Sequence, residues 1–435
     1  MRLKNPSPSW RSQVESWYLA YAALGVAVAG MAPILLPLVV SRTGNAADVG
    51  LVMAAFSLGG LAAPAWGVLA DHRRLHRLLL RSGLGLAGLS LAAFPLFPNV
   101  AAGVALALIQ SSCAAAAGTV ANLFIVELHP KTEWDGRISW LQTFYGGGQC
   151  AGLVLAGALT GAGYTMGLII AGAIAALGLI PAWKAPRMPP SAAVPRPVLR
   201  HAARHLDSSA GSPLRSYHYP GKDSLFRLVR SFFSPFGLLL FGWCVSFAGA
   251  GGYFALYPIV MQKEFGVAPP VAATGFAVAA GLGLLLYAPS GRWSERWGSL
   301  PVLRGGLFVR LFSFIGLYGL GFVHLPIAGP MALGGFLFLV LAWSPLSVAG
   351  TAMAAQLSTL GEGEGLGLFN ATSAIGGTAG AFLGGVCSEQ WGFAAVSMLG
   401  ILGVGMALII FLAVPGETRG GGKYGASDTM ERSRG

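Results

Sequence analysis

Long apolar runs separated by short polar segments make up most of this 435-residue chain. Each run holds about 20 residues with few or no charges, which is enough to cross a hydrocarbon core of about 30 Å as a helix. Strands of a membrane barrel would alternate polar and apolar residues, and these runs do not. Because backbone groups in lipid must be bonded within their own segment, the pattern predicts an all-α integral membrane protein. Twelve spans are expected, at about 17–40, 49–70, 78–97, 100–127, 138–161, 164–183, 235–261, 271–289, 301–323, 327–353, 365–387 and 393–414.

A polar stretch divides these spans into two sets of six. Residues 184–230 are rich in Pro and Ser and carry nine Lys or Arg. They offer too little apolar surface to fold alone, so we interpret them as a basic linker on the membrane surface. The predicted organisation is a six-helix bundle over 1–183, the linker over 184–230, a second bundle over 231–414 and a tail over 415–435.

The positions of the basic residues predict the orientation in the membrane. Twenty-five of the 28 Lys and Arg fall on one side of the twelve-span arrangement, which includes both termini and the linker. Cytoplasmic loops carry such an excess, so both termini are expected in the cytoplasm. The first run is too long for the apolar part of a signal peptide and is expected to be retained. We expect the protein in the plasma membrane, the inner membrane of a bacterium.

Composition argues against several other classes of protein. Only 10% of the residues are charged and 54% are hydrophobic, which excludes an ordinary soluble domain. The net charge of +12 does not indicate nucleic-acid binding, because the basic residues lie between apolar runs and not on a soluble face. The four cysteines all fall within apolar runs and predict neither disulfides nor a metal site. No cofactor and no catalytic set are expected. The partners expected are the lipid bilayer and a small solute, and the oligomeric state is open, with a monomer plausible.

A motif that precedes the third span returns before the ninth. The starting residues, Gly67 and Gly291, are 291 − 67 = 224 residues apart, about half the chain. We interpret each copy as a helix end, a tight turn with one acid, and a cationic patch at the membrane surface. The residues concerned are Gly67, Asp71, Arg73, Arg74 and Arg77 in the first copy, and Gly291, Glu295, Arg296 and Gly298 in the second.

A second repeated sequence pattern relates the fifth and eleventh spans. Gln142, Gly148, Gly152 and Gly157 correspond, after adding 228, to Asn370, Gly376, Gly380 and Gly385. Small residues four apart allow helix backbones to approach closely. The repeated motif and the repeated glycine pattern together predict that the halves are copies of one structural unit.

With twelve spans, a long basic loop after the sixth and this repeated motif, the chain resembles the major facilitator superfamily over nearly its full length. The resemblance implies two six-helix bundles around a central cavity lined mainly by the first, fourth, seventh and tenth helices. It also implies that Asp71 caps a helix beginning near Gly365 and that Glu295 caps one beginning near Gly136. The first motif copy departs from the family pattern, with His72 and Arg74 in place of the usual arginine and glycine.

Proton-coupled drug exporters of this superfamily carry two further features that are missing here. The stretch from Ala107 to Ser111 lacks their arginine in the fourth helix, and the fifth span lacks their Gly-Pro pair. Membership of that subgroup is therefore not supported.

The loop before the eleventh span carries two acids, Glu362 and Glu364, and no basic residue. We hypothesise that these acids pair with Arg73, Arg74 and Arg77 when the two halves close at the cytoplasmic side. Single exposed ion pairs contribute only ~0–1 kcal/mol, so several pairs would have to act together.

Arg310 is the one ionisable residue predicted deep within a span. Such groups are costly in lipid and usually functional. Two interpretations are open: a side chain that extends back to the headgroups, which we favour, or a contact to an anion or substrate.

The other cavity candidates are neutral and are chosen from their positions along the spans. Apolar walls with a few polar groups suit a neutral or amphipathic organic solute. The full set is Tyr21, Gln110, Ser111, Gln142, Gln149, Trp243, Tyr253, Arg310, Trp343, Ser344 and Asn370.

These features predict a secondary transporter that moves a small organic solute by alternating access. Export is favoured over uptake of a small metabolite, and a non-transporting receptor or scaffold on the same fold is a further alternative. No mid-membrane carboxylate is present to relay protons, so facilitated diffusion or a coupling that the sequence does not reveal is expected. An intramembrane enzyme would need a catalytic set, which is absent from the sequence.

Overall fold

The computed structural model describes residues 14–187, 234–323, 327–358 and 362–413. Within these ranges the side chains of residues 71–73, 131–132, 135 and 362–364 are left out. Most of the predicted linker and the tail therefore lie outside the described residues, as do the side chains of Asp71, Arg73, Glu362 and Glu364.

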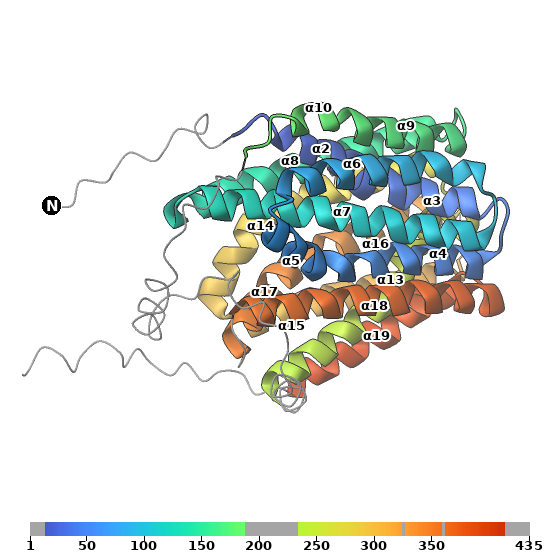
Figure 1. The fold of residues 1–435 in the computed structure, drawn as a ribbon. Coiled ribbons are helices and arrows are strands. Elements are labelled where there is room, and N and C mark those ends of the chain that lie inside the picture. Colours follow the sequence, from blue (N-terminus) through green and yellow to red (C-terminus); the bar gives the residue numbers. More distant parts are fainter. Residues whose placement is uncertain (1–13, 188–233, 324–326, 359–361, 414–435) are drawn as a thin grey trace, which may run out of the picture.

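The described residues form helices joined by short loops, and the helices make up twelve membrane-length runs in two sets (Figure 1). The first set comprises α2 (Tyr18–Leu24), η1 (Gly25–Met31) and α3 (Ala32–Val40) as one run; α4 (Ala46–Leu58), η2 (Gly59–Ala62) and α5 (Ala63–Arg73); α6 (His76–Ala93) and η3 (Phe94–Leu96); α7 (Val100–Leu128); α8 (Lys131–Leu159); and α9 (Tyr164–Leu177) with α10 (Leu179–Ala182).

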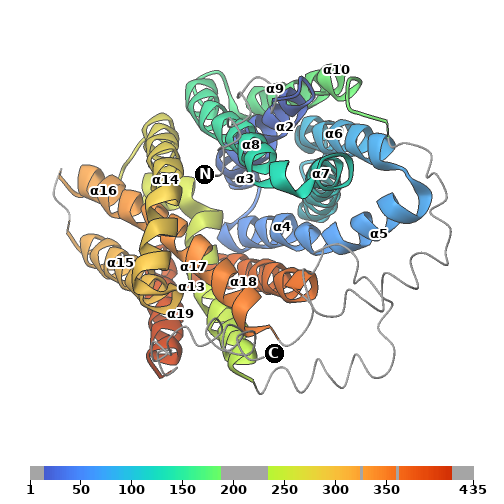
Figure 2. The same cartoon turned by 90° about the vertical axis from the view of Figure 1, so that its left-hand side faces the viewer.

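The second set repeats this plan. It comprises α13 (Pro235–Lys263), α14 (Pro269–Trp297), α15 (Ser299–Leu320), α16 (Ala328–Leu341) with α17 (Trp343–Leu357), α18 (Glu362–Trp391) and α19 (Ala394–Ala413). Figure 2 views the bundle along its helices, with the first set at the upper right and the second at the lower left. The twelve-span prediction is confirmed.

Ten of these runs are long and apolar enough to cross a membrane by composition alone. The other two, α8 and α18, have 29 and 30 residues and are long enough, but they are less apolar. They lie where the two halves meet, α8 beside α14 and α18 beside α4. Their polar residues are therefore less exposed to lipid than they would be on an outer helix, which explains the weaker hydropathy signal.

Polar side chains fix where several helices begin. Asn45 accepts a hydrogen bond from the N–H of Asp48, and Asp48 accepts one from the N–H of Asn45, which forms a capping box at the start of α4. Asn99 caps α7 and Ser234 caps α13 in the same manner, by accepting from the N–H three residues on. These caps satisfy backbone donors that would otherwise lack partners.

The repeated glycine pattern of the fifth and eleventh spans has a direct structural counterpart. A methyl group on Gly152 of α8 would clash with the carbonyl of Val26, and one on Gly380 of α18 would clash with the carbonyl of Ala248. In both halves a glycine of the fifth helix thus allows backbone contact with the first helix. Gly148 and Gly376 lie in the same way against Ala22 and Cys244. The repeat predicted from sequence is present in three dimensions.

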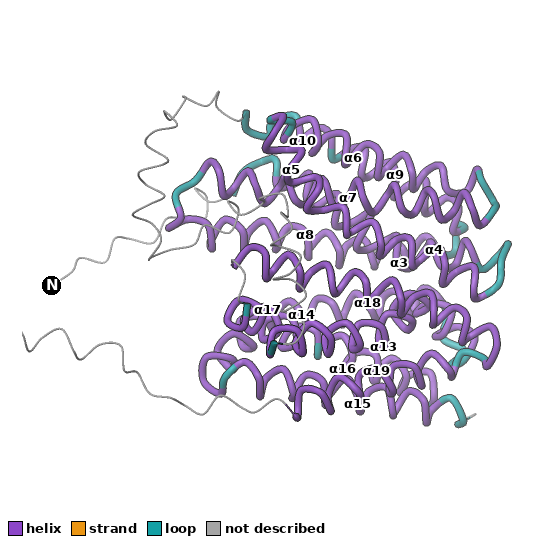
Figure 3. The backbone as a smooth tube through the Cα atoms, turned by 60° about the horizontal axis from the view of Figure 1, so that its bottom comes forward, coloured by secondary structure: helices purple, strands orange, loops and turns teal. Residues whose placement is uncertain are grey.

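The bundle has two distinct ends. We call the end where α10 stops and α13 starts the linker end, and the opposite end, which carries the loops around 41–45 and 264–268, the far end. Figure 3 shows the loops of the far end at the right. At the far end the halves are in contact: Gly50 of α4 lies against Gly385 of α18, and Gly157 of α8 lies against Pro270 of α14.

The repeated motif differs from its predicted form. The sequence predicted that the second and eighth spans end near residues 70 and 289, but α5 continues to Arg73 and α14 to Trp297. A glycine within an apolar membrane helix does not end it, because lipid offers the backbone no alternative hydrogen-bond partner. The turns fall after the acids, at Arg74 (φ 52°) and Gly298 (φ 90°), which are again 224 residues apart.

Candidate functional site

A cavity of about 510 Å³ lies between the two halves near the middle of the bundle. Its lining residues come from the first, second, fifth, seventh, eighth, ninth, tenth and eleventh helical runs. Its volume falls within the range of small-molecule sites. A site with walls from both halves changes shape when the halves move relative to each other.

Regular spacing along each helix explains which residues reach the cavity. On α13 the lining residues are Phe247, Ala250, Gly251, Phe254 and Ala255. Their spacing of three and four residues places them on one face of a helix. On α14, Phe276, Ala280, Gly283, Leu284 and Tyr287 follow the same rule.

The first half contributes an irregular helix segment to the cavity wall. Residues Gly25–Met31 form a π-helical turn within the first run, and Val28 and Ala29 of this segment line the cavity. π-Helical turns are rare and are frequent at functional sites. Tyr145 and Gln149, from the adjoining part of α8, supply polar groups on this side.

Arg310 lines the cavity from the middle of α15. It lies 310 − 299 = 11 residues after the helix begins and 320 − 310 = 10 before it ends, and its side chain is 3% exposed. The distance to either helix end is ~15 Å at 1.5 Å per residue, which is beyond the reach of a side chain. The favoured interpretation, a side chain that extends to the headgroups, is therefore wrong for this structure.

Aromatic rings flank the Arg310 guanidinium. Its Cζ lies 5.9 Å from the ring centre of Phe254 and 5.9 Å from that of Trp343, close to the outer limit for cation–π attraction. Ser344, next to Trp343, donates a 2.7 Å hydrogen bond to the carbonyl of Gly283. This bond joins α17 to α14 at the cavity wall.

Four of the eleven cavity candidates lie on this cavity, namely Gln149, Arg310, Trp343 and Ser344. The other seven lie elsewhere in this conformation. Gln142 and Asn370 are exposed. Gln110 is buried, and its amide has no hydrogen-bond partner within the described part of the chain.

The remaining four are packed inside one half. Tyr21 stacks on Tyr145 at 4.7 Å, and Ser111 donates to the carbonyl of Ala107. Trp243 stacks on Phe369 at 4.5 Å and donates to Ser373. Tyr253 is fully buried against Phe314 and Phe336.

The motif residues lie at the linker end of the bundle. Glu295 and Arg296 are exposed. The helix that Glu295 was expected to cap begins at Lys131 and not near Gly136. Arg77 donates to the carbonyl of Trp183 within its own half. The predicted pairs of Asp71, Arg73, Glu362 and Glu364 involve side chains outside the described residues.

A carboxylate does meet a helix start from the opposite half, but at the far end. Glu389, at the end of α18, accepts a 3.0 Å hydrogen bond from the N–H of Ala46, the first residue of α4. Sequence reasoning placed this kind of contact at Asp71 and Glu295 and missed Glu389. The sequence from Asn45 to Asp48, which forms a capping box in the structure, was a signal for the start of α4 that the prediction of a span from residue 49 did not use. Nothing in the sequence indicated that Glu389 would lie beside it.

A second polar contact missed from the sequence joins segments at the linker end of the first half. Arg137, 8% exposed, donates to Glu15 at 3.1 Å and to Glu133 at 2.8 Å. His129 lies 3.0 Å from the same Glu15 carboxylate. This cluster, Glu15, His129, Glu133 and Arg137, holds the segment before α2 against α8.

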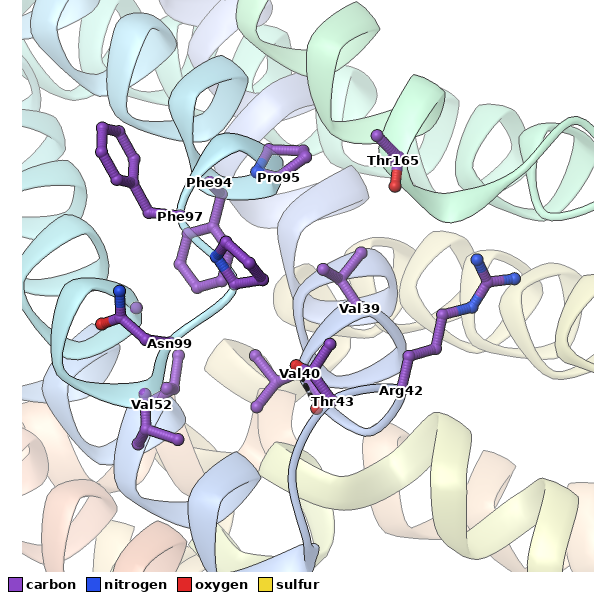
Figure 4. Close-up of a pocket in the computed structure, with 13 residues that line it drawn as sticks. Val39, Val40, Arg42, Thr43, Val52, Phe94, Pro95, Phe97, Asn99 and Thr165 are labelled. Carbon is purple, nitrogen blue, oxygen red and sulfur yellow. Dashed lines mark hydrogen bonds between the residues drawn. The ribbon is translucent and has the colours of Figure 1, made fainter.

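A smaller pocket of about 120 Å³ lies in the first half at the far end (Figure 4). Val39, Arg42 and Phe94 are among its lining residues. The Arg42 side chain stacks on Tyr164, with 4.4 Å from its Cζ to the ring centre. The pocket is separate from the central cavity and receives walls from the first half alone.

Metal ligands are not gathered in the described part of the structure. No group of three His, Cys, Asp or Glu side chains there is placed to hold a metal ion. The cysteines, Cys113, Cys150, Cys244 and Cys387, are not joined in disulfides.

Two repeated six-helix halves around a shared central cavity define a membrane transporter fold. The sequence matches the Major Facilitator Superfamily profile over residues 17–354 and again over 239–428, and the chain belongs to this family. No curated protein matches the sequence significantly.

Several solved structures share the fold at low sequence identity. A point mutant of the nucleoside transporter NupG is 12% identical with a TM-score of 0.71, over 93% of this chain and 98% of that one. A D-xylose-proton symporter is 17% identical with a TM-score of 0.68, over 92% and 97%. A bacterial homolog of the human lysosomal transporter Spinster, inward-facing and occupied, is 14% identical with a TM-score of 0.69, over 93% and 97%.

Family membership makes the chain an integral membrane transporter and not an enzyme. At identities of 12–17% the similar structures define the fold of this chain and not its solute.

Proposed function

We propose that this protein moves a small amphipathic organic solute across the plasma membrane by alternating access. The observation that supports this most is the cavity of about 510 Å³ shared by both halves, which touch each other at the far end. Rocking of two such halves around a fixed site exposes it to one side of the membrane at a time.

The linker end is the cytoplasmic side in this proposal, because most Lys and Arg gather there in the sequence. Contact between Gly50 and Gly385 then closes the side away from the cytoplasm. The conformation described here corresponds to the state in which solute exchanges with the cytoplasm.

Export remains the favoured direction, and uptake is the second candidate. Uptake gains support from the D-xylose-proton symporter among the structures that share the fold. Transport is proposed to be facilitated diffusion, because the lining of the cavity contains no carboxylate that could relay a proton.

Solute flux into liposomes containing the purified full-length chain tests this function. We expect saturable flux of an amphipathic solute that an imposed pH gradient does not drive to accumulation.

Labelling of a cysteine introduced at exposed Glu295 with a membrane-impermeant reagent tests orientation. Modification from the cytoplasmic side alone is expected, and modification from outside contradicts the assigned orientation.

A receptor on the same fold would bind solute without flux. Binding measured by ligand-induced thermal stabilisation, combined with absence of flux in the same preparation, would therefore exclude the transport proposal and favour the receptor.

A further inference from the structure

We propose that Arg310 binds the carboxylate of a small amphipathic organic anion in the central cavity. This inference deepens the proposed function, on which it rests, by naming the chemical class of the solute. It narrows the predicted neutral or amphipathic solute to an amphipathic monoanion.

The first observation that supports this proposal is the charge of the residues that line the cavity. Arg310 is the one charged residue among those that line the cavity, and no Asp, Glu or Lys is part of the lining. The potential inside the site is therefore positive. In a region of low dielectric, such a field favours an anion over a neutral solute of the same shape.

The second observation is that the Arg310 guanidinium has no ionic partner within the described part of the chain. No hydrogen bond or ion pair joins it to these residues, and its Nε is buried without an acceptor. A buried charge without a partner is costly, so proteins normally pair such a group. A bound anion would supply the missing partner.

Comparison with other arginines of the same structure shows how unusual this is. Arg137, also buried, is paired with Glu15 and Glu133. Arg304, six residues before Arg310 on the same helix, donates twice to the carbonyl of Phe411. The chain thus provides partners for arginines whose role is structural, whereas Arg310 lies at the wall of the cavity without one.

The shape of the guanidinium and of its surroundings indicates the kind of anion. Arginine presents donors in a planar fork that matches the two oxygens of a carboxylate. Phe254 and Trp343 flank it, and Phe247 and Phe276 extend the apolar wall. A solute with a carboxylate at one end and an aromatic or aliphatic body fits this arrangement.

Paired ligands that differ only in charge test the proposal. The purified full-length chain is titrated with benzoate, 3-phenylpropionate and octanoate, and with the neutral amide of each, while thermal stabilisation and calorimetric affinity are measured. We expect at least one carboxylate to bind at least about tenfold more tightly than its amide, as a charge-assisted hydrogen bond allows. If no carboxylate binds better than its amide, the proposal is overturned.

Variants locate the effect at Arg310. In Arg310→Gln the preference for the carboxylate is expected to disappear, and in Arg310→Lys, which keeps the charge without the fork, the preference should weaken and remain measurable. Arg187→Gln removes the same charge from an exposed position and should leave the preference unchanged. An unchanged preference in a folded Arg310→Gln protein overturns the proposal, and the melting transition of each variant establishes folding.

Flux separates this inference from the proposed function. If carboxylates bind through Arg310 but do not cross liposome membranes, the anion site stands and transport of these solutes fails. If flux is observed only for neutral solutes and is the same in Arg310→Gln, transport stands and the anion site is overturned.

Discussion

Gly50 of α4 and Gly385 of α18 touch so closely that a methyl group added to either would come within 2.6 Å of the Cα of the other. The contact joins the two halves at the far end, about one helical turn from the hydrogen bond between Ala46 and Glu389. The equivalent contact of the repeat, Gly157 with Pro270, lies on the other side of the same end. Two symmetric glycine contacts thus allow the halves to approach there.

A larger side chain at Gly50 should open the far end. Replacement by Leu cannot be accommodated, because the nearest atoms are backbone atoms of α18 that have no room to move within their helix. We expect a cysteine placed at Ser57, which lines the cavity, to react with a membrane-impermeant maleimide from the far end in Gly50→Leu and to be protected in the parent. Gly60→Leu is the control, because nothing lies within 4 Å of a Cβ there. Equal protection in both variants contradicts the closure of this end by glycine contact.

Glu389 should stabilise the same closed end through charge. Its carboxylate accepts from the first N–H of α4, where the positive end of the helix dipole favours an anion. Such contacts are modest at an exposed site, so Glu389→Ala is expected to raise the far-end labelling rate by about two- to fivefold. Gln390→Ala, at the neighbouring exposed position, should have no effect. A Glu389→Ala protein that labels as slowly as the parent would show that the contact does not bias the two states.

Arg74 adopts a left-handed backbone conformation at a position where the second half has Gly298. This conformation costs a non-glycine residue roughly 1–2 kcal/mol, partly offset because glycine loses more chain entropy on folding. Arg74→Gly is therefore expected to stabilise the protein by about 0.5–1 kcal/mol, measured as a higher melting temperature in detergent. Gly298→Ala should produce a change of opposite sign. Destabilisation by Arg74→Gly would show instead that the arginine side chain makes a contact that outweighs the strain.

The spans were predictable from the sequence because the burial of about twenty apolar residues in lipid depends on their composition. It does not depend on which face of the helix points toward the protein. The residues facing the cavity depend on rotation about each helix axis, which the sequence does not reveal for helices that are apolar all round. On α13 the prediction selected Tyr253, which packs inside its own half, whereas Phe254, rotated by one residue, lines the cavity. The spacing of Phe247, Gly251 and Phe254 would have identified the face if one member had been known.

Contacts between segments far apart in the chain were the least predictable. Glu389 was overlooked because its role depends on the position of Ala46, which lies 343 residues away. Arg310 was recognised as exceptional because charge is rare within a span, but its favoured role assumed that the cavity is lined mainly by the first, fourth, seventh and tenth helices. Since the cavity reaches α15, that assumption fails and the arginine becomes part of the cavity wall.

Two buried arginines should respond to the same substitution in opposite ways. Arg310 has no described partner and its charge is costly, so Arg310→Met, which keeps an unbranched apolar side chain, is expected to raise the free energy of unfolding of the ligand-free protein by about 1–3 kcal/mol. Arg137 holds Glu15 and Glu133, and Arg137→Met leaves both carboxylates without their cation, so a loss of about 1–3 kcal/mol is expected. Thermal unfolding in one detergent measures both. A loss of stability in Arg310→Met as large as in Arg137→Met would mean that Arg310 is paired within the protein, and the cavity would then have no charge to offer a solute.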